Sequence, residues 1–468
     1  MKVFRVVPIL ALVALLWLPF SQPASADAQV CPSATLSPGI PHEVTLQDPQ
    51  EPNQTDFDCF SWQSLVGLSW AATADANGKP DTSIPFGQTG SRGLVVWQTY
   101  KNWDAVFPQN NNPNPCPDGK DNCWNTPLAG GANLYATSKS GGFLDGQVQA
   151  VPNAWLTDQN GQLTRYEILV NRDEFEFVVK NDLYDGSEQK KYPNNINMPE
   201  GKNGGPEGPI ELKAAWKILS DNDDPSKYFS TIATIQDTKI NPENGYPQPN
   251  GGVYMTCKGS ANGICQRPVG LVGFHIAHKV KDNPQWVWST FEHKNNAPIQ
   301  KKGEQPEVDE GTTYSYFKKD CGSGKECTKN TNPRDIPIPV TTPNQVTRYI
   351  DPHYGVGKIL PKKVNSQWQQ LLAGTVWENY ELISTQWPTD PQNKVECKAL
   401  QDIGIKYFEP QGCPTPPILA NITMETYIQG DHVKPEYASS CIGCHQYGAL
   451  LNGKKADFSY LFSRAKPN

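Results

Sequence analysis

Two cysteines and a histidine lie within five consecutive residues, in the sequence Cys441-Ile442-Gly443-Cys444-His445. On one helical turn, two thiols at this spacing can add to the two vinyl groups of a haem, and the adjacent histidine is then presented to the iron. The motif therefore predicts one covalent c-type haem. Cys441 and Cys444 would be the attachment sites, and His445 would be the proximal iron ligand.

Two other uses of this motif are weaker. A structural zinc site needs about four Cys or His ligands, and no second Cys-x-x-Cys pair occurs in the chain. A thioredoxin-like redox pair needs a strand before it and a βα unit around it, and residues 436–440 do not have the pattern of a strand.

The second iron ligand is open from sequence alone. Only 23 residues follow His445, and they contain neither Met nor His, so a methionine or histidine ligand must come from upstream. Met424 is the first candidate because it lies 17 residues before Cys441, and a thioether there would raise the reduction potential. The alternatives are an iron open to small ligands, or one of the histidines His275, His278, His293, His353 and His432.

The N-terminal sequence predicts export. Two basic residues precede a short apolar run, and Ala24-Ser25-Ala26 follows as a small-x-small cleavage site. This pattern is typical of a secretory signal peptide rather than of a membrane span, which needs about 20 apolar residues. We therefore expect a signal peptide over 1–26, a periplasmic location and no membrane span.

Twelve cysteines fit an oxidising compartment. Ten lie outside the haem motif and form five pairs of sequence neighbours. Closing a short loop costs the least entropy, so we expect neighbours to pair as disulfides. The expected pairs are Cys31–Cys59, Cys116–Cys123, Cys257–Cys265, Cys321–Cys327 and Cys397–Cys413.

The elements that must position the motif are mostly strands. In residues 210–218 apolar side chains occupy the even positions and charges most of the odd ones, which predicts a half-buried strand. Similar patterns predict strands over 229–235, 269–280, 286–292 and 380–387, and helices are expected over 60–70, 172–183 and 366–376. Strands separated by irregular loops favour an α+β fold with a mostly antiparallel sheet. We expect an α+β body with disulfide-stapled loops over 27–395 and a small helical haem-binding segment over 396–468.

Several other polar and aromatic residues have ordinary structural interpretations. His275 and His278 are an odd number of positions apart in a strand, so they should lie on opposite faces and bind no common ion. The carboxylates of Asp173, Glu174 and Glu176 are expected on the solvated face of a helix. The tryptophans, among them the Trp286 and Trp288 pair, are expected to be core residues.

Ser440 to His445, followed by Ala456-Asp457-Phe458-Ser459, is similar to the end of large bacterial single-haem proteins of the cytochrome c family. Further segments resemble that family, so that the resemblance spans about 60–465 of the chain; these segments are residues 62–70, 96–101, 213–216 and 284–293. Such a resemblance implies haem binding and electron transfer, and it implies no particular substrate.

Composition narrows the choice of partners. The net charge is −7 with no basic block, so nucleic acid is an unlikely partner. We expect a periplasmic redox protein with one haem c that exchanges electrons with a partner protein. A haem enzyme of the peroxidase or oxygenase type, with an open iron site, is the main alternative, and a binding protein in which the haem is structural is a third. The oligomeric state stays open.

Overall fold

The structure is a computed structural model. It describes residues 29–75, 77–91, 93–108, 124, 132–134, 149, 154–248, 250–350, 360–392, 413–429 and 439–467. The expected signal peptide lies outside these residues, as do Cys116, Cys123, Cys397, His353 and His432.

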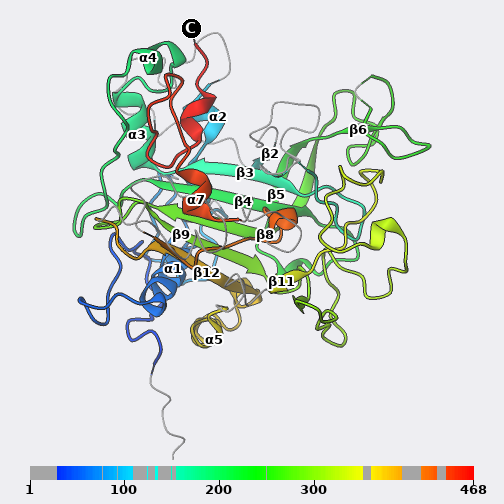
Figure 1. Cartoon of the computed structure of the whole chain (residues 1–468), viewed down its shortest axis with the longest axis horizontal. Coiled ribbons are helices and arrows are strands. Elements are labelled where there is room, and N and C mark those ends of the chain that lie inside the picture. The colour runs from blue at the N-terminus through cyan, green and yellow to red at the C-terminus, as the bar shows by residue number, and fades with distance from the viewer. Residues whose placement is uncertain are drawn as a thin grey trace, which may run out of the picture.

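A large, mostly antiparallel sheet forms the centre of the molecule (Figure 1). Its strands run in the order β1-β3-β4-β8-β9-β12-β13, and β5 pairs with both β8 and β2. The β2–β5 pair is parallel, and the other ladders of this sheet are antiparallel. The strands are β1 (Lys101–Asn102), β2 (Ala132–Leu134), β3 (Arg165–Val170), β4 (Ile210–Ile218), β5 (Ser230–Gln236), β8 (Ile264–His278), β9 (Val287–His293), β12 (Tyr380–Pro388) and β13 (Pro414–Thr415).

The remaining elements are short. Small two-stranded ladders are β6 (Lys239–Ile240) with β7 (Val253–Tyr254), and β10 (Ile299–Lys301) with β11 (Arg348–Ile350). The α-helices are α1 (Gln54–Leu68), α2 (Trp103–Val106), α3 (Arg172–Lys180), α4 (Gly186–Lys191), α5 (Lys362–Leu371) and α7 (Cys441–His445). The 3-10 turns are η1 (Val96–Thr99), η3 (Pro225–Lys227), η4 (Lys325–Cys327), η6 (Val376–Asn379), η7 (Thr426–Ile428) and η9 (Leu461–Arg464). The expected α+β class with a mostly antiparallel sheet is confirmed.

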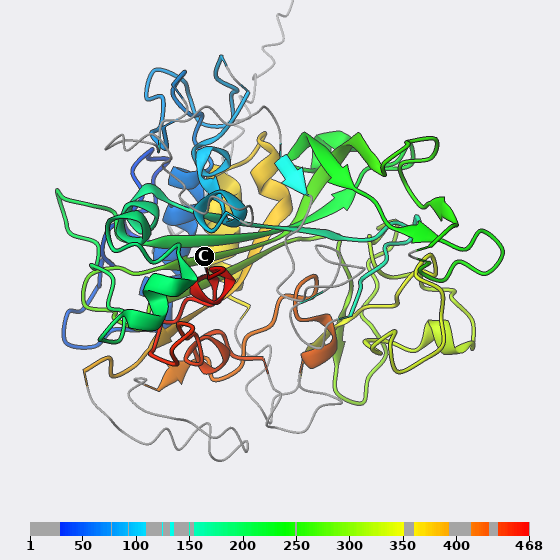
Figure 2. The same ribbon diagram turned by 90° about the horizontal axis from the view of Figure 1, so that it is seen from above.

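One face of the sheet, here called the helical face, packs against α1 and α5. Figure 2 shows these helices on one side of the sheet and the C-terminal segments on the other. Asn53 caps α1 by accepting from the backbone N–H groups of the first turn. Within α1, the Ser61 hydroxyl lies 2.7 Å from Ser289 Oγ of β9 and 2.6 Å from Thr385 Oγ1 of β12. Trp62 donates to Asn365 of α5 at 2.8 Å. These contacts fix both helices on the sheet.

The opposite face, here called the polar face, carries side chains that alternate with the core residues of the same strands. Antiparallel partners share a face, and Lys213 lies opposite His275, which lies opposite Thr290. The prediction that strand 210–218 is half-buried is wrong. Eight of the nine residues of β4 are buried and Lys213 is intermediate. Several segments cover the charged side chains: Glu211 lies beside Glu174 of α3, Lys213 near Glu425, and Lys217 beside Asp158 and Asp223. The sequence pattern identified the strand but gave no sign of the segments that cover its charged side.

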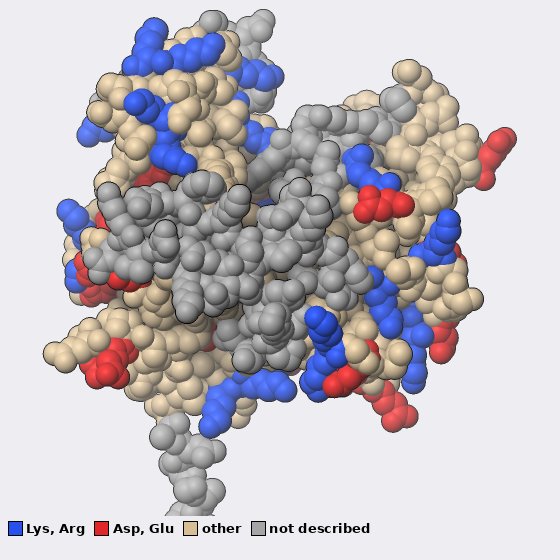
Figure 3. Space-filling model, in the orientation of Figure 1, with Lys and Arg blue, Asp and Glu red and all other residues tan. Residues whose placement is uncertain are grey.

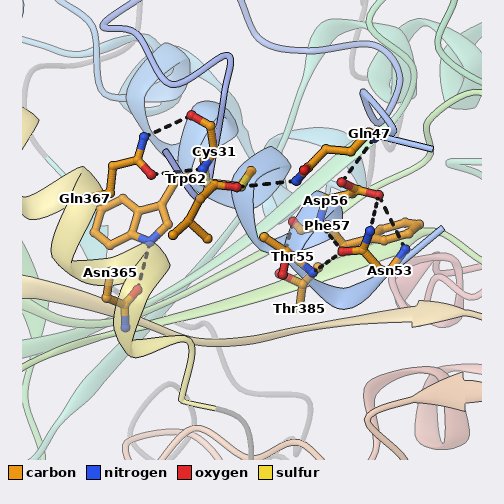
Figure 4. The surroundings of a disulfide bond; sticks show 12 residues. Cys31, Gln47, Asn53, Thr55, Asp56, Phe57, Trp62, Asn365, Gln367 and Thr385 are labelled. Atoms are coloured by element: carbon orange, nitrogen blue, oxygen red, sulfur yellow. Dashed lines mark hydrogen bonds between the residues drawn. A yellow bond between two sulfur atoms is a disulfide. The ribbon is translucent and has the colours of Figure 1, made fainter. Parts of the chain in front are cut away.

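Three of the expected disulfides are present: Cys31–Cys59, Cys257–Cys265 and Cys321–Cys327. Cys413 is also disulfide-bonded. Figure 4 shows how the first bridge is placed: the Cys31 N–H donates to Gln367 of α5, and the Gln367 amide donates back to the Cys31 carbonyl, both at 2.9 Å. The bridge therefore ties the start of the described chain to both helices of the helical face.

Among the described residues, no helix is both long enough and apolar enough to cross a membrane.

Candidate functional site

The Cys-x-x-Cys-His residues form the short helix α7 on the polar face of the sheet. Ser440 caps it, because its hydroxyl accepts from the Gly443 N–H at 3.2 Å. Ile442 is fully buried in the main core, whereas Cys441 is half-buried and Cys444 is exposed. Buried Ile442 therefore fixes the helix to the body while the two thiols stay near the surface.

Strand β12 fixes the start of α7. The Gln386 side chain accepts from the Ile442 N–H at 2.8 Å and donates to the Pro416 carbonyl at 2.7 Å. Next to it, the Leu419 N–H donates to the Ser439 carbonyl at 2.9 Å. One glutamine of the body thus holds both C-terminal segments against the edge of the sheet.

The His445 ring has a defined orientation. Its Nδ1 donates to the Phe458 carbonyl at 2.8 Å, and carbonyl oxygens can only accept. The ring lies 4.4 Å from Trp288 of β9 and 5.2 Å from Tyr460, measured between ring centroids. In the neutral imidazole the proton is therefore on Nδ1, and Nε2 is the ring nitrogen that carries the lone pair, which is the tautomer found in many metal-binding histidines.

The backbone that supplies this carbonyl is held in an uncommon conformation. Asp457 and Phe458 have φ angles of +52° and +68°, a region that residues with a Cβ rarely adopt. Asp457 is buried, and its carboxylate accepts from the Lys279 ammonium and from the Met198 N–H, both at 2.7 Å. Contacts from the body thus hold the turn that orients His445.

The Cys441 environment favours the neutral thiol. Burial raises the pKa of Cys441 well above its ordinary value, and the charges of Glu425 and Cys444 raise it further. Cys444 lies on the outer side of α7, where the Tyr460 hydroxyl donates to the Cys444 carbonyl at 2.7 Å.

Four side chains form a polar cluster on the same face of the sheet. This cluster, here called the polar quartet, consists of Lys213, His275, Thr290 and Glu425. His275 Nδ1 lies 2.9 Å from the Thr290 hydroxyl, and His275 Nε2 lies 3.2 Å from Glu425 Oε2. Burial alone would raise the pKa of Glu425, but His275, Lys213 and the Asn421 N–H together lower it. The His275 and Glu425 side chains are 17% and 21% exposed, so solvent reaches them.

Met424 has a structural environment of its own. It is almost fully buried in a cluster with Tyr166, Ala215 and Val272, whereas Cys441 and Ile442 belong to the main core cluster. The segment that carries Met424 nevertheless reaches the motif, because the neighbouring Glu425 acts on the Cys441 thiol. Met424 as an iron ligand stays a prediction, and its packing favours a role in the core.

The described histidines separate as their positions in the strands predict. His278 lies on the helical face beside Phe60, with ring centroids 5.9 Å apart, while His275 lies on the polar face. His278 and His293 are buried and bonded to backbone carbonyls, and burial lowers the pKa of each to about 4. Of the described histidine candidates, His275 is the one that shares the face of α7.

The carboxylates of α3 and the Trp288 side chain differ in part from what the sequence predicts. Glu176 is exposed as expected and Asp173 is intermediate, but Glu174 is buried. Burial, followed by the nearby Glu211, raises the pKa of Glu174 well above its ordinary value. Trp288 is a core residue as expected, and it also contacts the His445 ring.

The sequence did not predict the roles of the Phe458 carbonyl and Glu425, since no local spacing links either residue to the motif.

No protein-family model, no curated protein and no solved structure matches the chain. Within the described ranges, no group of three or more His, Cys, Asp or Glu side chains is placed to hold a metal ion.

Proposed function

We propose that the chain is a c-type cytochrome that carries one covalent haem on Cys441, Cys444 and His445. The observation that carries this proposal is the hydrogen bond from His445 Nδ1 to the Phe458 carbonyl. Metal-binding histidines commonly donate their second ring nitrogen in this way, which fixes the ring and leaves the other nitrogen as the ligand.

The donor set also fits a haem. Cys444 is exposed and Cys441 is half-buried, so both thiols lie where they can add to vinyl groups. A bound haem supplies one-electron redox chemistry at this position. The chain's own residues hold the imidazole against the Trp288 and Tyr460 rings.

We assign the protein to the periplasm and to electron transfer with a partner protein there. The signal-peptide pattern over 1–26 supports export, and the disulfides are typical of an oxidising compartment. The resemblance of 60–465 to large single-haem cytochrome c family proteins supports the same assignment.

A denaturing gel stained for haem-linked peroxidase activity tests this proposal. The full chain, expressed with its signal sequence in a bacterium that attaches haem c, should keep the stain after reduction and denaturation. Cys441→Ala combined with Cys444→Ala should lose it, while Cys257→Ala combined with Cys265→Ala should keep it. Stain that washes out of the unaltered protein would overturn the proposal.

A haem enzyme with an open iron site is the second candidate. The polar quartet favours it, because solvent-accessible acid–base side chains in the middle of a sheet face are typical of active sites. The packing of Met424 away from the main core cluster points the same way. A high-spin spectrum that changes on adding carbon monoxide would favour the enzyme, and a low-spin spectrum that does not change would favour the carrier.

A further inference from the structure

We propose that the surface beside α7 is a docking site for an acidic partner protein. The site, here called the lysine patch, consists of Lys190, Lys191, Lys454, Lys455 and Lys466. The inference rests on the proposed function insofar as the partner exchanges electrons with the chain.

The lysine patch is one continuous surface built from two segments far apart in sequence. The Gly186 N–H donates to the Lys466 carbonyl at 3.0 Å, and the Ile196 N–H donates to the Lys455 carbonyl at 2.8 Å. Between them, the Asn452 amide donates to the Tyr192 carbonyl at 2.9 Å. Figure 3 shows Lys and Arg side chains gathered over α4 and the C-terminal segment, at the upper left.

The sign of the charge on this surface is opposite to that of the whole chain. All five lysines are exposed, and within residues 451–467 every exposed charged side chain is positive. Asp457, the acidic residue of that segment, is buried against Lys279. On the α4 side, Glu188 pairs with Lys191 and Asp182 and Asp185 lie nearby, so acidic residues offset the two lysines of α4. The positive excess of the patch therefore comes from the three lysines of the C-terminal segment. Since the whole chain carries −7, the patch is a local charge reversal.

The patch directly adjoins the Cys-x-x-Cys-His helix. The Lys455 ammonium donates to the Gln446 carbonyl at 3.1 Å and lies 5.8 Å from the centre of the Tyr447 ring. Gln446 follows His445 directly, and Cys444 is exposed on the same helix. A molecule bound to the patch would therefore lie close to the site of haem attachment.

Two exposed apolar side chains indicate that the bound molecule is a protein. Tyr447 is 48% exposed and Leu451 is 37% exposed, and both lie among the lysines. An apolar centre with a charged rim is the usual composition of a protein–protein interface. A positive rim selects a partner with an acidic surface and raises the rate of encounter.

The test uses the haem-loaded full chain and the variant Lys190→Glu, Lys191→Glu, Lys454→Glu, Lys455→Glu. The control variant changes Lys318, Lys319, Lys362 and Lys363 to Glu, which alters the net charge equally at exposed sites of the 302–347 loop and α5. Binding of poly-L-glutamate is measured by calorimetry at low salt. The patch variant should lose this binding, and the control should keep it.

Electron exchange with small complexes tests the link to α7. At low salt the reduced protein should transfer one electron to hexacyanoferrate(III), an anion, about tenfold more slowly in the patch variant than in the control. With tris(phenanthroline)cobalt(III), a cation, the order should reverse. Both differences should vanish at about 0.5 M salt, where screening is strong.

Equal poly-L-glutamate binding by the two variants would overturn the inference. So would binding of the unaltered protein to vesicles of anionic phospholipid but not to poly-L-glutamate, which would identify the patch as a membrane-binding surface. Protein purified without covalent haem would overturn the proposed function instead, and the poly-L-glutamate measurement would still decide the fate of the patch.

Discussion

At the scale of single residues, the site depends on the orientation of one imidazole. A histidine on a short, partly exposed helix could adopt several rotamers and either neutral tautomer. The Phe458 carbonyl selects the tautomer, and the Trp288 and Tyr460 rings restrict the rotamer. The orientation of the His445 ring is therefore defined within the folded chain.

Met424→Leu separates the two roles considered for this side chain. Leu and Met have similar volumes, so filling of the second core cluster is preserved and the free energy of unfolding should change by less than about 1.5 kcal/mol. Because Met424 packs with Tyr166, Ala215 and Val272, we expect the haem absorption spectrum of the variant to match that of the unaltered protein.

The weak long-wavelength absorption band of methionine-ligated ferric haem is the relevant measurement. Its presence in the unaltered protein and loss in Met424→Leu would show that Met424 is the ligand, contrary to this expectation. Met255→Leu is a control, since Met255 is buried in a third cluster with Trp155 and Leu163.

The sequence predicts the chemistry of the site only for residues that lie close together in the chain. The cysteines and His445 lie within five residues, so their chemistry is visible in the spacing. Trp288 contacts His445 across more than 150 residues, and Glu425 lies close enough to Cys441 for its charge to act on the thiol. No sequence spacing encodes such contacts, because tertiary packing alone creates them.

At the scale of elements, a buried ion pair supports the turn that orients His445. The Lys279 ammonium at the end of β8 is fully buried and binds the Asp457 carboxylate at 2.7 Å. Asp457 and Phe458 have positive φ angles, which cost free energy unless surrounding contacts hold them. The ion pair supplies such contacts directly before the carbonyl that accepts from His445.

Lys279→Met should therefore weaken both the fold and the orientation of His445. Removing one partner of a buried pair leaves an unpaired charge, and we expect a loss of about 3–5 kcal/mol in the free energy of unfolding. The iron–histidine stretching frequency of the reduced protein, measured by resonance Raman, should also shift because Nδ1 loses a well-placed acceptor.

Lys281→Met is the matched control. Lys281 lies two residues further along and forms an exposed pair with Glu43, so its loss should leave both the free energy of unfolding and the frequency nearly unchanged. A shift of equal size in both variants, or in neither, would contradict the proposed support of the turn.

The strands were the most predictable elements. Residues 210–218 coincide with β4, and the segments near 229–235, 286–292 and 380–387 match β5, β9 and β12 within one residue at each end. The predicted helix over 366–376 is shifted toward the C-terminus, since α5 runs from Lys362 to Leu371. The first residues of α5 are polar, so the apolar pattern did not indicate where the helix begins. Strand β3 was not predicted at all. Alternation marks strands well, but it does not show which charged faces other segments will cover.

At the scale of the whole molecule, segments packed on both faces of the sheet leave many ionisable groups buried. Burial raises the pKa of four carboxyl groups to about 7, namely Asp58, Asp158, Glu167 and Glu207. Burial lowers the pKa of His278 and His293 to about 4. The fold therefore favours neutral forms of acids and bases alike.

The net effect on stability has a definite sign. Between pH 5 and 7 the four carboxyl groups bind more protons in the folded chain than in the unfolded chain. Their contribution to the free energy of unfolding therefore falls as pH rises. The two histidines act in the opposite direction between pH 4 and 6.5, but they are fewer. We expect the melting temperature to fall between pH 5.5 and 8, with a loss on the order of a few kcal/mol.

Thermal unfolding followed by circular dichroism measures this trend. Asp58→Asn should flatten it by removing one of the four buried acids, whereas Asp224→Asn, at an exposed turn, should leave the slope nearly unchanged. A melting temperature that rises steadily from pH 5.5 to 8 would contradict the predicted charge states.

The mass of the purified chain tests the central claim most directly. The full chain is expressed with its signal sequence in a bacterium that attaches haem c, and is then denatured, reduced and weighed intact. We predict a chain heavier than the polypeptide by the mass of one haem, with the added mass confined to the proteolytic peptide that contains Cys441 and Cys444. A chain with the mass of the polypeptide alone, or haem attached to any other peptide, would contradict the account.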